Sequence, residues 1–200
     1  MPPTLLQWLL FHTLAGLTIG ALEASQFQFM ATLIFSGLLV GVAQWFVLRH
    51  VLRKAFRWIW VSAIGWLLGM QLMIWLSGWL DPIVAHLAQL GGGEVFWLNV
   101  VKQPIALLGM GTAQSLLLPS LWRRTGEKAR CRWIVASGIA GAIQGGSSAL
   151  LCATFCPAFT GQLGTILATA IVYGVGWFSY SVIVAFLLYK LLFSSASEHL

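Results

Sequence analysis

The chain has 200 residues, of which 59% are hydrophobic and 8% are charged, and its formal net charge is +6. Water-soluble domains carry about 25% charged residues, so this composition excludes a soluble globular domain. Because lipid removes the need for a charged surface, the sequence predicts an all-α, multi-pass membrane protein that forms a single domain over residues 1–200.

Six apolar stretches have roughly the 20 residues that a membrane-spanning helix needs. They cover residues 5–22, 27–48, 58–80, 97–121, 133–155 and 158–189. We expect the first to be a retained span and not a signal peptide, because no basic segment precedes it. The sixth is longer than one span requires, and Pro157, Gly161 and Gly164 predict that its helix begins near Thr165.

Residues 81–96 connect the third and fourth stretches on the outer side. Asp81-Pro82 is a helix-start signal, and the apolar residues Ile83, Val84 and Leu87 follow it. We therefore expect a short separate helix that lies on the outer membrane surface or caps the bundle.

Basic residues predict the orientation, because Lys and Arg collect in cytoplasmic loops. Nine of them lie in the second and fourth connections: Arg49, Arg53, Lys54, Arg57, Arg123, Arg124, Lys128, Arg130 and Arg132. The other side holds Glu23, Asp81 and Glu94, with Lys102 as the exception. Six alternating spans with both termini cytoplasmic satisfy this pattern. The nine cations predict contact with anionic lipid or an acidic partner, and no nucleic acid is implied.

Two segments of the chain repeat one pattern. Residues 41–44 (GVAQ) match residues 111–114 (GTAQ), and the later Arg57-Trp58-Ile59 with Ser62 matches Arg132-Trp133-Ile134 with Ser137. The repeat unit is a helical hairpin, with copies over residues 29–80 and 97–155. Both copies run in the same direction, as in some transporter folds.

Small residues predict where helices pack closely, because lipid provides no hydrophobic force between helices. Four pairs of glycines are spaced four residues apart: Gly16 and Gly20, Gly37 and Gly41, Gly65 and Gly69, and Gly141 and Gly145.

Four glutamines interrupt the apolar stretches: Gln44, Gln71, Gln114 and Gln144. A buried amide needs hydrogen-bond partners, so we expect all four to face the bundle interior and bond across its centre. They would then act either as interhelical contacts or as a polar solute site.

No constellation indicates catalysis or a metal site, and we expect no enzyme. His12 is the only histidine deep in a span and is a weak candidate ligand for a chlorophyll-type pigment; bound lipid is the other possible cofactor.

Cys152 and Cys156 form neither a CxxC nor a haem motif, and a disulfide between them requires a helix break that Pro157 permits. An aromatic belt at headgroup depth is expected from tryptophans near the two boundaries, namely Trp8, Trp45, Trp58, Trp60, Trp122 and Trp133 on the cytoplasmic side and Trp79 and Trp97 on the outer side.

The stretch GVAQWFVLR, a basic turn and then WIWVSAIGW, within residues 41–69, resembles a group of multi-pass membrane proteins of cyanobacteria and other bacteria. The second copy departs from the pattern at Ser115 and Pro119. The resemblance implies a source and an architecture but no activity. In size and span number the chain is also similar to substrate-binding subunits of energy-coupling-factor vitamin transporters.

These observations favour an accessory or scaffold subunit of a larger complex in a bacterial inner or thylakoid membrane, for which a photosynthetic pigment-protein complex is one host. The alternative is a small-solute binding or transport subunit with a polar site at the repeat interface. A polar cavity lined by the four glutamines would favour the alternative, and a closed centre would favour the scaffold.

Overall fold

The computed structural model describes residues 5–25, 27, 29, 31–50, 52, 54–117 and 127–193, and all regular structure in them is helical. The elements in chain order are α1 (Leu5–Glu23), η1 (Ala31–Phe35), α3 (Ser36–Leu48), α4 (Arg57–Gln89), α5 (Glu94–Leu116), α7 (Glu127–Phe155), η2 (Cys156–Ala158) and α8 (Gly161–Phe193). The predicted all-α class is confirmed.

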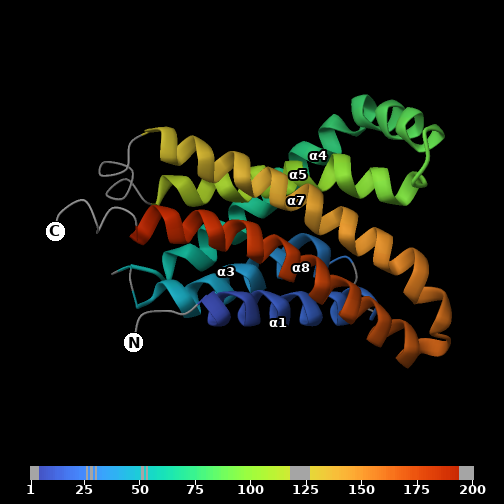
Figure 1. Cartoon of the computed structure of the whole chain (residues 1–200), viewed down its shortest axis with the longest axis horizontal. Helices are drawn as coiled ribbons and strands as arrows, with labels where there is room; N and C mark the ends of the chain where they lie inside the picture. The colour runs from blue at the N-terminus through green and yellow to red at the C-terminus, as the bar shows by residue number, and fades with distance from the viewer. Residues whose placement is uncertain are drawn as a thin grey trace.

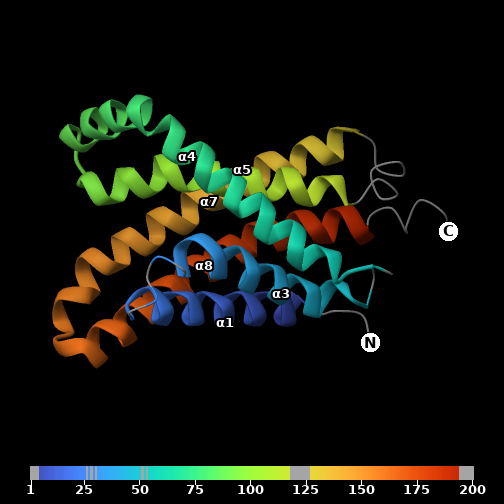
Figure 2. The same ribbon diagram turned by 180° about the vertical axis from the view of Figure 1, so that it is seen from behind.

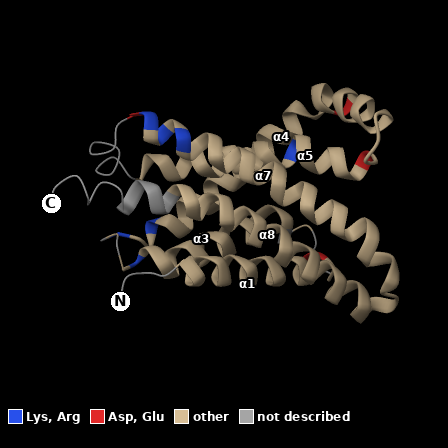
Figure 3. Ribbon diagram, in the orientation of Figure 1, with Lys and Arg blue, Asp and Glu red and all other residues tan. Residues whose placement is uncertain are grey.

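The six α-helices of the described residues run in alternating directions along the chain (Figure 1), and their contacts close a ring. Around the ring, α1 contacts α8, α8 contacts α7, α7 contacts α5, α5 contacts α4, α4 contacts α3, and α3 contacts α1. The start of α1 and the end of α8 lie at the same end of the bundle (Figure 1). Figure 3 shows that Lys and Arg gather at this end, which we call the basic end; the other is the far end.

Four of the described helical segments are long and apolar enough to cross a bilayer: Leu5–Glu23, Arg57–Gln89, Glu127–Ala158 and Gly161–Leu187. The second predicted stretch corresponds to a shorter apolar helix, Thr32–Leu48. The fourth predicted stretch corresponds to α5. This helix is not one of the segments apolar enough to span a bilayer, because Asn99, Lys102 and Gln103 interrupt its apolar residues. Length and composition therefore support four of the six predicted spans.

The prediction of a separate short helix from Asp81 is wrong. Helix α4 continues through Pro82 to Gln89, and its last part bends away from the direction of its first part (Figure 2). Proline removes one backbone donor and crowds the preceding turn, which kinks a helix without necessarily ending it. The connection to α5 is made by Gly91, Gly92 and Gly93, whose φ angles of 116°, 86° and 78° strongly favour glycine.

The start of α8 also differs from the prediction. The helix begins at Gly161, one turn before Thr165, and Gly161 has a φ of 75°. The positive φ lets the chain reverse immediately after η2, so the glycine forms the helix boundary itself.

All eight predicted packing glycines lie against a neighbouring helix. A Cβ at Gly16 or Gly20 would come within 2.6 Å or 2.5 Å of a backbone oxygen of α8. Gly37 and Gly41 face α4, Gly65 and Gly69 face α5, and Gly141 and Gly145 also face α5. Because these contacts involve backbone atoms as well as side chains, the helices would have to separate to admit even a methyl group.

Substitution of Gly69 tests this packing. A Cβ there would lie 2.5 Å from the backbone oxygen of Ala106, whereas a Cβ at Gly78 on the same helix has nothing within 4 Å. We expect Gly69→Ala to lower the free energy of unfolding by about 1–3 kcal/mol through overpacking. Gly78→Ala should be neutral or stabilising by up to about 1 kcal/mol, since alanine favours helix. Unfolding in mixed detergent micelles, followed by tryptophan fluorescence, measures both; equal effects would contradict the packing.

Candidate functional site

Two of the four predicted glutamines bond to each other at the centre of the ring. Gln114 Nε2 donates to Gln44 Oε1 at 2.7 Å and to Ser62 Oγ at 2.8 Å. The indole Nε1 of Trp58 donates to the same Gln44 oxygen. Gln44, Gln114 and Ser62 are all 0% exposed. We call these four residues the amide cluster; it joins α3 to α5, which are not neighbours in the ring.

Residues at matched positions of the two sequence copies make matched contacts. A Cβ at Gly41 would lie 3.0 Å from Cβ of Ser62, and a Cβ at Gly111 would lie 2.7 Å from Cβ of Ser137. The Trp58 and Trp133 rings meet edge to face with centroids 6.1 Å apart. Both are buried, so they face the interior of the bundle and not the outer surface that an aromatic belt would occupy. Trp58 packs inside because its indole N–H donates to the amide cluster. Trp122 lies outside the described residues.

The amide cluster is closed. Its two glutamines and Ser62 are fully buried, and neither glutamine lines the cavity described below. The cluster therefore serves as a contact between helices and offers no open site to a solute.

The other two glutamines do not join the cluster. Gln71 is exposed, so its prediction as an interior residue is wrong. It follows Gly69 by two positions, which places it on nearly the opposite face of α4 from the glycine that packs on α5. Gln144 is buried, but it lines a separate cavity nearer the far end.

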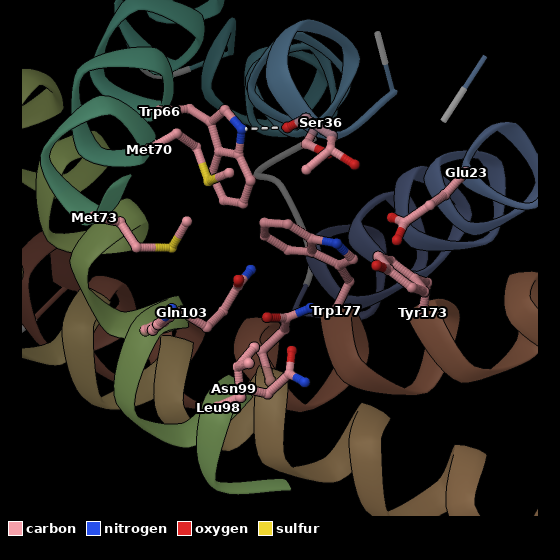
Figure 4. Close-up of a pocket in the computed structure, with 13 residues that line it drawn as sticks. Glu23, Ser36, Trp66, Met70, Met73, Leu98, Asn99, Gln103, Tyr173 and Trp177 are labelled. Atoms are coloured by element: carbon pink, nitrogen blue, oxygen red, sulfur yellow. Dashed lines mark hydrogen bonds between the residues drawn. The ribbon is translucent and has the colours of Figure 1, made fainter. Parts of the chain in front are cut away.

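That cavity has a volume of about 260 Å³ and is the candidate functional site (Figure 4). All six helices contribute to its lining, which consists of Glu23, Thr32, Ser36, Trp66, Met70, Met73, Leu98, Asn99, Lys102, Gln103, Gln144, Tyr173 and Trp177. On α4, α7 and α8 these residues lie one or more turns farther from the basic end than the residues around the amide cluster. The cluster thus lies on the basic-end side of the cavity.

Lys102 is the one basic residue that the predicted orientation places on the outer side, and it has an ion-pair partner. Its Nζ lies 2.6 Å from Oδ1 of Asp81 and donates to Ser77 Oγ at 3.3 Å. Both partners are on α4, so the contacts attach α5 to the distal part of α4. The ammonium is largely buried at the cavity and the carboxylate is exposed.

The rest of the lining combines aromatic rings with polar groups. The Trp66 and Trp177 rings have centroids 6.2 Å apart, and Trp66 Nε1 donates to the backbone oxygen of Thr32 at 2.8 Å. Figure 4 shows the Gln103 amide extending into the space between α4 and α8, and the Tyr173 hydroxyl facing the Glu23 carboxylate.

Most of these residues do not stand out in the sequence. Asn99, Lys102 and Gln103 are the available signal, because spacings of three and four residues place polar groups on one face of a helix. The position of Glu23 in the sequence predicts orientation only. Tyr173 had no signal, because nothing in its apolar surroundings separates it from a packing residue.

The predicted cationic surface is found at the basic end. Arg49, Lys54, Arg57, Lys128 and Arg132 are exposed, whereas Arg130 is half-buried and donates to Ser115 Oγ at 3.3 Å. Arg53, Arg123 and Arg124 lie outside the described residues. An apolar groove with Lys128 and Arg132 at its edge runs along α7 and is lined also by Val135, Ile139 and Leu187. This combination suits the predicted contact with anionic lipid.

His12 is enclosed between α1 and α8. Its Nδ1 lies 2.8 Å from the backbone oxygen of Trp8, and its ring is 4.4 Å from the Trp8 ring and 6.0 Å from that of Tyr180. The side chain is 0% exposed, which leaves no space for a pigment macrocycle against the ring. The suggestion of His12 as a pigment ligand is therefore wrong.

Helix α7 ends at Phe155, which provides the break that a disulfide between Cys152 and Cys156 requires. Cys152 and Cys156 form a disulfide where α7 passes into η2, and Cys131 is a free, exposed cysteine at the basic end. Within the described ranges, no group of three or more His, Cys, Asp or Glu side chains is placed to hold a metal ion.

Comparison with known proteins identifies no relative. No family model, curated protein or solved structure matches the chain. The resemblance to bacterial multi-pass proteins therefore stays a prediction. The geometry and charges of the cavity are the basis for a function.

The amide cluster is tested by removing one amide. In Gln114→Leu the shape is nearly kept, but Ser62 and Gln44 each lose a partner. We expect a loss of about 1–2 kcal/mol in the free energy of unfolding in mixed micelles. Gln71→Leu is the matched control and should have little effect, because Gln71 is exposed. A Gln114→Leu protein as stable as the control would show that the cluster contributes no stability.

Proposed function

We propose that this chain is a multi-pass membrane protein that binds a small polar solute in the cavity at the far end. The observation that carries the proposal is a cavity of about 260 Å³ with charged and amide side chains, inside a ring of otherwise apolar helices. Polar groups at membrane depth are costly and usually face a functional site or pathway. Concave sites with a few polar groups among apolar walls are also the usual form of small-molecule sites.

Three observations support the membrane assignment and its orientation. Four segments are long and apolar enough to span a bilayer. The basic residues gather at one end, which favours the cytoplasmic side for that end and for both termini. The disulfide between Cys152 and Cys156 lies at the far end, and disulfides persist in oxidising compartments outside the cytoplasm. A bacterial inner or thylakoid membrane fits this arrangement.

The position of the cavity favours entry from the outer side. Glu23 is the last residue of α1 and Ser36 the first of α3, so both lie at far-end helix termini. On the opposite side, the buried amide cluster closes the centre of the ring. A solute captured from outside would therefore stop at the cluster, as in a binding subunit.

The proposed role is binding and not catalysis. The cavity lining includes neither histidine nor cysteine, and Lys102 is paired with Asp81. The accessory-subunit hypothesis stays a prediction. Exposed apolar residues such as Trp75 and Trp79 suit lipid and a neighbouring protein equally, and a scaffold role does not account for the cavity.

Labelling of Cys131 tests the membrane orientation. This thiol is exposed at the basic end, and the other two cysteines are disulfide-bonded. A membrane-impermeant maleimide should label the protein in inside-out vesicles and not in right-side-out vesicles. Cys131→Ser is the control and should remain unlabelled in both. Labelling only from outside would reverse the orientation, and extraction of the protein by alkaline carbonate would overturn the membrane assignment.

Ligand-dependent stabilisation tests the cavity. A panel of small amines, amino acids, carboxylates and sugars is added to the purified protein, and the thermal midpoint is measured. At least one compound should raise the midpoint by an amount that grows with its concentration. Gln103→Trp should abolish that shift by filling the cavity, while Leu163→Trp, at an exposed position of α8, should preserve it. No shift with any compound, or a shift that Gln103→Trp leaves intact, would reject the site.

A further inference from the structure

We infer that the cavity selects an organic cation, namely a protonated amine attached to a small flat apolar group. The inference rests on the proposed solute-binding function and names the chemical class of its ligand. Three features of the lining carry it: an uncompensated carboxylate, a buried acceptor without a donor, and a pair of tryptophan rings.

The charges of the lining do not cancel. Lys102 and Asp81 form the one ion pair found among the described residues, so the ammonium at the cavity is already neutralised. Glu23 is half-buried and has no ion-pair partner in that part of the chain. The sequence from residue 24 to residue 48 contains no Lys, Arg or His that could supply one. The cavity therefore holds a carboxyl group, Glu23, that has the Tyr173 hydroxyl as a hydrogen-bond partner but no counter-charge among the described residues.

A carboxylate removed from water without a counter-charge destabilises the protein. A ligand with a positive charge would offset that cost on binding, whereas an anionic ligand would add to it. Glu23 thus favours cations and disfavours carboxylates and phosphates.

Gln144 provides the second feature. Its side chain is 3% exposed, it lines the cavity, and its Oε1 has no hydrogen-bond donor. Buried acceptors without donors are rare in native proteins. Of the unpartnered buried atoms among the described residues, the Gln144 oxygen is the one that belongs to a residue of the cavity lining. Glu23 and Gln144 Oε1 are both acceptors, and an ammonium group is a donor only, with three N–H groups. A neutral alcohol could satisfy one acceptor but would leave the charge of Glu23 unbalanced.

The tryptophans provide the third feature. Trp66 and Trp177 have centroids 6.2 Å apart with an interplanar angle of 46°, and both rings line the cavity. The N–H of Trp66 is used within the protein, so what this side chain offers the cavity is ring carbon and not a donor. Indole faces attract cations and stack on flat groups, and the thioethers of Met70 and Met73 contact aromatic edges favourably.

The volume limits the ligand further. Sites for drug-sized molecules range over roughly 300–1,000 Å³. A cavity of about 260 Å³ is smaller, so it fits an amine that carries one ring or two fused rings.

A set of probes that differ in charge tests the inference on the native protein. The probes are tryptamine, the neutral alcohol tryptophol and the anion indole-3-propionate, measured by isothermal titration calorimetry in detergent at pH 7. We expect tryptamine to bind at least about tenfold more tightly than tryptophol, and indole-3-propionate to bind more weakly than either.

The role of Glu23 is then isolated with two variants. Glu23→Gln should weaken tryptamine binding by about tenfold or more and leave tryptophol binding unchanged. Glu94→Gln, an exposed acidic residue outside the cavity lining, is the control and should change neither. If Glu23→Gln does not fold, the comparison of the three probes on the native protein still decides the question.

The outcomes separate this inference from the proposed function. Equal binding of the three probes, preference for the anion, or no binding of tryptamine would overturn the cation inference. If another compound of the panel still binds and Gln103→Trp abolishes that binding, the solute-binding function stands without it. If no compound binds at all, both proposals fail.

Discussion

The hydrogen bond from Gln114 to Gln44 is the contact on which the centre of this protein depends. It joins α3 and α5, which are not neighbours in the ring but flank α4, at a point where both side chains are fully buried from water. Ser62 and Trp58 complete the contact, so one amide pair ties three helices together. The cluster fills the centre of the ring toward the basic end, and the cavity lies on its far-end side.

The glycines make this arrangement possible. Each packed glycine lets two helix backbones approach to a distance that a methyl group would prevent, and small residues then serve as the contact surface. The tight pair of α4 with α5 brings Ser62 within reach of Gln114 and Ser77 within reach of Lys102. Where the contacts are instead made by Trp66, Trp177 and two methionines, the helices enclose the cavity.

The two charged features of the far half have different consequences. Lys102 is balanced by Asp81, so it fixes α5 against the bent end of α4 and contributes little net charge. Glu23 has no such balance among the described residues, and it sits at the end of α1 where the ring opens. In the proposed function, structural stabilisation and ligand selection thus depend on different charges, on helices that are not neighbours in the ring.

The sequence by itself determined the helical class, the alternation of the six helices, the charge asymmetry and the glycine positions, because these depend on composition and on spacing along one helix. It also predicted that Gln44 and Gln114 meet, since they occupy equivalent positions in two hairpins. Only the tertiary structure decided that Gln71 faces outward, that Gln144 belongs to a different site, and that α4 continues through Pro82. It alone also brought Glu23, Gln103 and Trp177 together, because helix rotation and the order of helices around a ring depend on contacts between distant segments.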